Sequence, residues 1–260
     1  MQWKTVLFLV SIAVMTSHSY AEYETVNVFG SIGGGFGMGG FRYRSTDISN
    51  NSSSVKDRFF NYGSGFKFDI GCQYFAMENV AIQPSFSYSV GTPVIKENIT
   101  DNTSRVTTYH RHLFGIKLQV VPRFEVLSLI NMYTGVGLGF YWNAQPFQDV
   151  YKVEGLGIEA KEEASGKITS KPALGFMGML GTDYPLNDKL TLFGEIGCEQ
   201  VSFSLDKFVV EKGSIATDTP QRAVGTTYYS KDDANPDNNP PEKVPGTNFQ
   251  IRVGIRFAIK

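Results

Sequence analysis

Long stretches in which apolar residues alternate with small or polar residues constrain this chain more than any other feature. Near the C-terminal end the apolar positions are Phe249, Ile251, Val253, Ile255, Phe257 and Ile259, separated by Gln250, Arg252, Gly254, Arg256 and Ala258. Successive side chains of a β-strand point to opposite faces, whereas a helix repeats every 3.6 residues. The pattern therefore predicts strands with one apolar face and one small or polar face.

About eight such stretches follow one another along the chain. The sixth is less regular, because Met177 and Met179 fall on the face that should be polar. Two further segments, 150–161 and 208–229, could pair as additional strands. The expected stretches are 26–38, 60–74, 80–90, 111–120, 130–142, 174–184, 189–203 and 249–259.

The connections between these stretches separate two all-β architectures, since a soluble sandwich also alternates. Short and long connections take turns, as they do between the periplasmic turns and external loops of outer-membrane barrels. Several stretches also exceed the ~9–11 residues that a tilted strand needs to cross the hydrocarbon layer. We therefore predict an all-β fold, a closed antiparallel transmembrane β-barrel of eight strands, with ten as the alternative. The short connections are 77–79, 126–129 and 185–188, and the long ones follow Met38, Val90, Trp142 and Phe203.

The N-terminus is typical of a secretory signal. Lys4 supplies a positive charge, Thr5 to Met15 form an apolar run, and Ser19-Tyr20-Ala21 is a small-x-small cleavage pattern. An uncut membrane helix is the alternative, but the run is shorter than the ~20 residues required to span a bilayer. We expect residues 1–21 to be removed after Sec-dependent export and residues 22–260 to form one barrel domain.

Composition and cysteine positions narrow the possible functions. The chain has 27 Gly, 20 Phe and 13 Tyr, which favours aromatic-rich strands packed around glycine, and its net charge of -1 gives no sign of a nucleic-acid partner. Cys72 and Cys198 both point outward by alternation. They lie on strands that are not neighbours in an eight-stranded ring, so we expect no disulfide between them.

The chain resembles the small outer-membrane barrel family that includes the OmpA membrane domain, OmpX and OmpW. The segments 133–139 and 181–186 look like strand and turn sequences of that family. The C-terminal segment fits the family's signal for the barrel-assembly machinery, although Ile259 stands where Phe is usual and Lys260 follows it. The resemblance implies a bacterial outer-membrane location, surrounding outer-membrane lipids and the assembly machinery as a partner. The signal residues are Arg252, Gly254, Phe257 and Ile259.

Charges of both signs fall on the face that should point into the barrel. One antiparallel register would place Glu195 opposite Arg256 and Glu199 opposite Arg252, so we expect an interior charge ladder. Charges buried in a small barrel must be paired, and such barrels are normally filled by side chains. The ladder is therefore expected to be a salt-bridged plug, and a gate or ion path is the alternative. The inward charges are Lys67, Asp69, Arg111, Lys117, Glu195, Glu199, Arg252 and Arg256.

Three other motifs do not predict a cofactor, metal or catalytic site. Gly35-x-Gly37-x-x-Gly40 matches a dinucleotide fingerprint, but no helix follows it. His110 and His112 could lie side by side on a strand and bind a metal, but no third ligand is evident. No nucleophile-base arrangement accompanies either histidine. We therefore expect no enzymatic activity, no cofactor and no metal.

Two functions remain open at this stage. The first is a monomeric, structural surface protein that stabilises the outer membrane and presents external loops to host surfaces or other ligands. We expect the polar segments 45–56 and 232–245 to be mobile, and the last loop to extend as a hairpin built from 208–210 and 226–229. The second is a narrow passive channel for small or apolar solutes, favoured by the space that inward glycines 135, 137 and 139 would leave.

Overall fold

The computed structural model describes residues 26–49, 52–99, 103–127, 130–153, 160–213, 224–228 and 242–259. Within these ranges the chain forms fourteen β-strands of one sheet. The expected signal segment 1–21 and most of the loop 232–245 lie outside the described residues. No helix among the described residues is long and apolar enough to cross a membrane.

Eight of the strands form a closed ring in which each strand is antiparallel to the next. The last strand pairs with the first along its whole length, from Val26 opposite Ile259 to Gly37 opposite Asn248. The prediction of eight strands is confirmed, because the described parts of the two additional candidate segments form the upper end of β7 and parts of β8, β11 and β12, and they add no strand to the ring. In ring order the strands are β1 (Val26–Gly37), β4 (Gly65–Met77), β5 (Val80–Ile99), β6 (Thr103–Leu127), β7 (Ile130–Val153), β9 (Ala173–Pro185), β10 (Leu190–Gln200) and β14 (Asn248–Ile259).

The predicted faces are also confirmed. Apolar residues that alternate along the ring strands are exposed on the outer wall, with Phe66 58% and Val253 54% exposed. Their neighbours in sequence point inward and are buried. The two methionines of the irregular stretch, Met177 and Met179, are buried inside the ring. That strand therefore still alternates between the two faces, although its inner face carries apolar residues.

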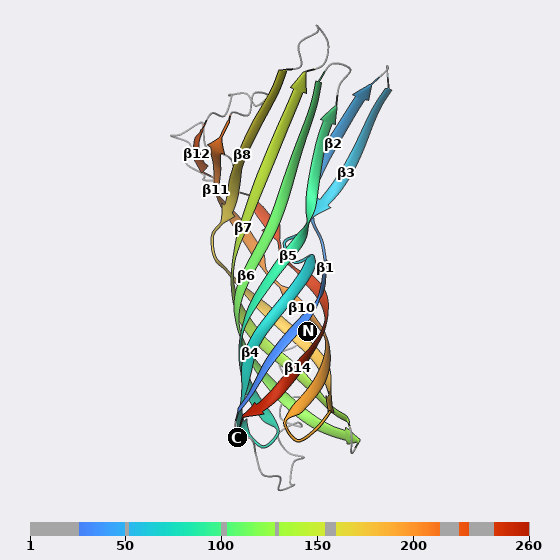
Figure 1. The fold of residues 1–260 in the computed structure, drawn as a ribbon, viewed down its shortest axis with the longest axis vertical. Helices are drawn as coiled ribbons and strands as arrows, with labels where there is room; N and C mark the ends of the chain where they lie inside the picture. The colour runs from blue at the N-terminus through green and yellow to red at the C-terminus, as the bar shows by residue number, and fades with distance from the viewer. Residues whose placement is uncertain are drawn as a thin grey trace, which may run out of the picture.

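The wall rises above the ring as an open sheet (Figure 1). The upper halves of β5, β6 and β7 continue into it, joined by β8 (Ala160–Ser170), β11 (Ser202–Lys212), β12 (Gly225–Tyr228) and β13 (Lys243–Pro245). A hairpin of β2 (Phe41–Ser49) and β3 (Ser52–Phe60) adds to β5 through Thr46 and Asp47. We name this part of the sheet the outer extension.

The outer extension shows the form of the four long external connections. The described parts of the segments after Met38, Val90 and Trp142 are mostly strand, the segment after Phe203 contributes β11, β12 and β13, and the polar segment 45–56 contributes to both strands of the β2–β3 hairpin. Outside hydrocarbon the outer face needs no regular apolar residue, so the alternation fades while backbone pairing continues. The hairpin expected in the last loop is confirmed, since Phe208 and Val209 of β11 pair with Thr227 and Thr226 of β12.

Replacing Val253 with Arg tests the assignment of the outer wall. Val253 lies near the middle of β14 and faces outward, where a buried cation in hydrocarbon should lower the free energy of unfolding by about 2–4 kcal/mol. The matched control is Leu186→Arg in the exposed turn between β9 and β10, which should cost less than about 1 kcal/mol. Urea unfolding in lipid vesicles measures both, and equal losses would contradict the membrane assignment.

Candidate functional site

The interior of the ring holds a continuous network of charged side chains. The alternation that places apolar residues outside points these residues inward, and the described carboxylates and most of the cations are nearly fully buried. They come from five ring strands. The members are Lys67 and Asp69 on β4, Lys117 and Arg123 on β6, Asp183 on β9, Glu195 and Glu199 on β10, and Arg252 and Arg256 on β14. We name this set the lumen network.

The upper half of the lumen network is organised around Lys117. Its Nζ lies 2.8 Å from Oδ1 of Asp69 and 2.7 Å from Oε1 of Glu199, so one ammonium bridges two carboxylates. The Glu199 carboxylate also accepts a hydrogen bond from Lys67 Nζ at 2.7 Å. Lys67 completes its hydrogen bonds with Asn248 and Gln250 of β14, at 2.9 and 3.1 Å. Each buried charge here meets at least two partners.

The lower half is organised around Arg252 and Arg256. Arg252 binds Asp69 at 2.9 Å and Glu195 at 2.6 Å, which joins the two halves. Arg256 lies between Glu195 and Asp183 and stacks over the Tyr133 ring, 4.6 Å from its centroid. The Tyr133 hydroxyl donates to Glu195 Oε1 at 2.8 Å. Buried ion pairs persist when each charge meets an opposite charge at short range, and every member of the lumen network has at least one ion-pair partner.

The predicted register of the ladder is wrong by four residues. Glu195 lies opposite Arg252 and not Arg256, and Glu199 lies opposite Asn248. Shifts of an even number of residues keep the same faces inward, so alternation cannot choose among them. The observed register places Gly254 opposite Phe193 and Gly197 opposite Gln250, which sets small residues against large ones.

Two members of the lumen network were missed in the sequence. Asp183 belongs to the less regular stretch, and Arg123 lies beyond the residues assigned to the fourth stretch. Both carry the parity of their inward neighbours, so extending the alternation would have found them. Arg123 binds Asp183 at 3.3 Å. It also donates to Gln73, the first of three interior glutamines that bond in sequence across β4, β5 and β6: Gln73, Gln83 and Gln119.

Inward glycines do not leave the lumen open, contrary to the expectation that favoured a channel. A Cβ on Gly137 would lie 2.8 Å from Cγ of Gln119, and one on Gly135 would lie 2.5 Å from Cε of Met179. The Tyr141 ring covers Gly139. Each glycine therefore accommodates a long side chain from the same or a neighbouring strand.

The remaining predicted inward charge, Arg111, belongs to a different cluster at the upper rim of the ring. It donates hydrogen bonds to the backbone oxygens of Asn61 and Thr92, and its Nη2 lies 2.7 Å from the Thr92 oxygen. The Asn61 amide in turn donates to the carbonyl oxygens of Gly39 and Thr247 at 2.8 and 2.9 Å. These bonds tie the segment 61–64 to the segments that follow β1 and precede β14.

Tyr62 extends from this rim into the mouth of the barrel. Its hydroxyl donates to Gln145 Oε1 on β7 at 2.7 Å, and its ring meets Phe203 edge-on at 5.3 Å between centroids. An apolar cluster surrounds it and continues into the outer extension. Among the described residues its buried members are Tyr62, Leu113, Tyr141, Phe147, Ala164, Ile168, Met177, Val201, Phe203, Leu205, Phe208, Val210 and Val244. We name this set the mouth cluster.

The other motifs of the sequence hold no ligand site among the described residues. Gly35 and Gly37 belong to β1, which is a strand paired on both sides. His112 on β6 is hydrogen-bonded through Nδ1 to the Tyr88 hydroxyl at 2.8 Å. Cys72 on β4 and Cys198 on β10 are free thiols on strands that do not pair. The described residues contain no group of three or more His, Cys, Asp or Glu placed to hold a metal.

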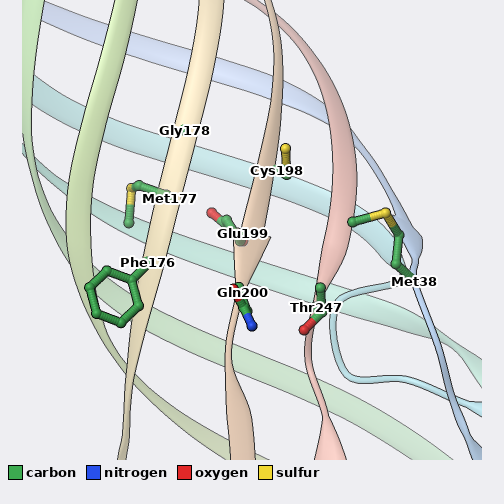
Figure 2. Close-up of a pocket in the computed structure, with 8 residues that line it drawn as sticks. All are labelled: Met38, Phe176, Met177, Gly178, Cys198, Glu199, Gln200 and Thr247. Atoms are coloured by element: carbon green, nitrogen blue, oxygen red, sulfur yellow. The ribbon is translucent and has the colours of Figure 1, made fainter. Parts of the chain in front are cut away.

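A groove of 330 Å³ marks the upper wall between β9 and β10 (Figure 2). Outward-facing Phe176, Gly178 and Cys198 line it, together with Met38 and Thr247 from the adjoining rim. Glu199 also borders the groove, but its carboxylate is held by Lys67 and Lys117 of the lumen network. The groove therefore offers a mainly apolar surface on the lipid side.

Comparisons with known proteins give one family match and several solved structures of partial similarity. The sequence profile of the outer membrane protein beta-barrel domain matches residues 6–257. Neisserial surface protein A is 10% identical over 92% of this chain and 100% of its own, with a TM-score of 0.44. The outer membrane protein AlkL, solved in lipid bilayers, is 14% identical over 94% and 95%, with a TM-score of 0.31. The translocator domain of the autotransporter NalP from Neisseria meningitidis is 11% identical over 98% and 94%, with a TM-score of 0.25. No curated protein sequence matches significantly.

Replacing Glu199 with Gln tests the energetic weight of the lumen network. The change leaves Lys67 and Lys117 with weaker partners in a buried site, and we expect a loss of about 3–5 kcal/mol in the free energy of unfolding. Glu211→Gln is the matched control, because Glu211 pairs with Lys167 at 2.8 Å with both side chains half exposed. That control should cost less than about 1 kcal/mol. Urea unfolding in lipid vesicles measures both variants, and a small loss at Glu199 would contradict the analysis.

Proposed function

The chain belongs to the outer membrane protein β-barrel domain family, and we propose that it is a non-enzymatic, non-conducting surface protein. In this proposal the ring anchors the molecule in the outer membrane and the outer extension presents a binding surface to host or other external ligands. The protein is an integral outer-membrane barrel, and its role within that membrane is the proposed part.

The filled lumen is the observation that carries the proposal. Lys117, Asp69 and Arg252 link strands across the ring through ion pairs of 2.8 and 2.9 Å. Below them the interior glutamines bond to one another, and above them the mouth cluster is apolar. Inward glycines are covered by side chains. A barrel of eight strands has an interior just wide enough for side chains, so such a filling leaves little room for solute flow.

The outer extension supports the second half of the proposal. Strands β6 and β7 have 25 and 24 residues, more than twice the ~9–11 needed to cross hydrocarbon. Paired strands hold this surface in a defined shape, which suits binding sites carried on a rigid scaffold. The pair Arg105 and Asp149 reinforces it, with Arg105 Nη2 2.7 Å from Asp149 Oδ2.

Assembly and oligomeric state are part of the same proposal. Arg252, Gly254, Phe257 and Ile259 lie on β14, the strand that closes the ring against β1. We propose that they form the signal read by the barrel-assembly machinery. The ring leaves no ladder unpaired between its first and last strands, which favours a monomer surrounded by outer-membrane lipids.

One observation favours the alternative of a narrow passive channel for small or apolar solutes. The mouth cluster gives the upper interior an apolar lining that such a solute would enter readily. The buried charges beneath it oppose onward movement, because an apolar solute would have to separate paired ions. We therefore place the channel second.

Planar-bilayer recording of the refolded full chain tests the proposal. We expect no steady single-channel openings from the wild-type protein. Glu195→Ala removes the partner that Arg252 binds at 2.6 Å, so we expect lower heat resistance on denaturing gels without new conductance. Steady openings in the wild type, or conductance that appears in the variant while heat resistance is unchanged, would favour the channel.

A further inference from the structure

The inner face of β7 above the lumen network carries buried polar groups without partners. Asn143 and Gln145 are 5% and 1% exposed. Among the described residues no hydrogen-bond partner exists for either amide atom of Asn143 or for the Gln145 amide nitrogen. Buried polar groups in native proteins are nearly always bonded, so two such residues on one face require a reason.

Two other strands, β5 and β8, carry further unpartnered polar groups. In the strand register Leu113 of β6 lies opposite both Asn143 of β7 and Ser89 of β5. The Ser89 hydroxyl is buried and has no partner among the described residues, and the Ser170 hydroxyl at the end of β8 is in the same state. We name Ser89, Asn143, Gln145 and Ser170 the mouth polar strip.

The chemistry of the mouth polar strip selects the ligand class. Its side chains carry no formal charge, and its amides and hydroxyls offer both donors and acceptors. Aromatic rings of the mouth cluster, including Tyr62, Phe147 and Phe203, surround it. Convergent neutral polar groups within an aromatic and apolar wall fit a neutral, polyhydroxylated solute, whose hydroxyls bond to the amides while its C–H faces contact the rings.

The Tyr62 side chain already makes one contact with the mouth polar strip. Its hydroxyl binds Gln145 Oε1 at 2.7 Å, which is the kind of contact that a solute hydroxyl would make. We propose that the mouth polar strip is a binding site for a neutral, sugar-sized polyol that enters from the outer side when the Tyr62 side chain turns aside. This site is additional to the ligand-presenting surface of the outer extension and does not depend on it.

Saturation-transfer NMR on the full chain in an amine-oxide detergent tests the proposal, because that detergent carries no sugar. Glucose is the probe, and glucuronate is its charged counterpart. We expect saturable glucose binding with a dissociation constant in the millimolar range, and binding of glucuronate at least about tenfold weaker, since the strip holds no charge to pair with a carboxylate. Absence of saturable glucose binding, or equal binding of both probes, would overturn the proposal.

Asn143→Leu separates a binding role from a structural one. The variant should weaken glucose binding at least about tenfold and raise the melting temperature by about 2 °C, because Leu replaces an amide that has no partner. Gln148→Leu is the matched control on the exposed, opposite face of β7, and it should leave glucose binding unchanged. Unchanged binding in Asn143→Leu, or a lower melting temperature, would assign Asn143 to the fold and refute the site.

Tyr62→Phe gives an independent readout. It removes the internal hydroxyl that competes for Gln145 Oε1 and keeps the ring against Phe203. Glucose should then bind several-fold more tightly than to the wild type. Equal or weaker binding would show that Tyr62 does not stand in the position of the solute.

Discussion

Closure of the hydrogen-bond ladder is the constraint on which the rest of the molecule depends. A strand in hydrocarbon has no water to bond, so every backbone donor and acceptor in the membrane must be satisfied within the sheet. The eight-strand ring meets this requirement because β14 pairs with β10 on one side and with β1 on the other. Closure fixes two surfaces at once, an outer wall that faces acyl chains and an interior that must be filled.

The filling of the interior follows from the size of the ring. Small residues on one strand face large ones on the next, as where Gly33 borders the Arg252 side chain, with a Cβ there only 2.8 Å from Cγ. Long cations can then reach across the lumen and meet carboxylates from other strands. Lys117 and Glu199 come from β6 and β10, and their 2.7 Å pair joins opposite parts of the wall. The glycines and the ion pairs are therefore two aspects of one packing arrangement.

Period-two alternation predicted the strand faces, the eight ring strands and the inward side of the charged residues. It could not predict the register of β10 against β14, because these strands are joined by a long segment with strands of its own and not by a tight turn. It also could not predict how far the strands extend beyond the membrane, since the alternation of apolar residues in β6 and β7 fades where the outer face leaves hydrocarbon. The prediction that the inward glycines leave open space in the lumen is wrong because a sequence does not show which side chain covers each glycine.

The two polar regions of the interior differ in charge and in whether each side chain has a partner, and that difference bears on function. In the lumen network Asp69 and Glu199 each meet two cations, so the region is explained by stability. At the mouth Asn143 has neither amide atom bonded within the described chain, although it lies beside the apolar mouth cluster. A leucine there would be expected to favour folding. A residue that works against stability where a simpler one would serve is most economically explained by a ligand, because departures from folding rules concentrate where a protein binds.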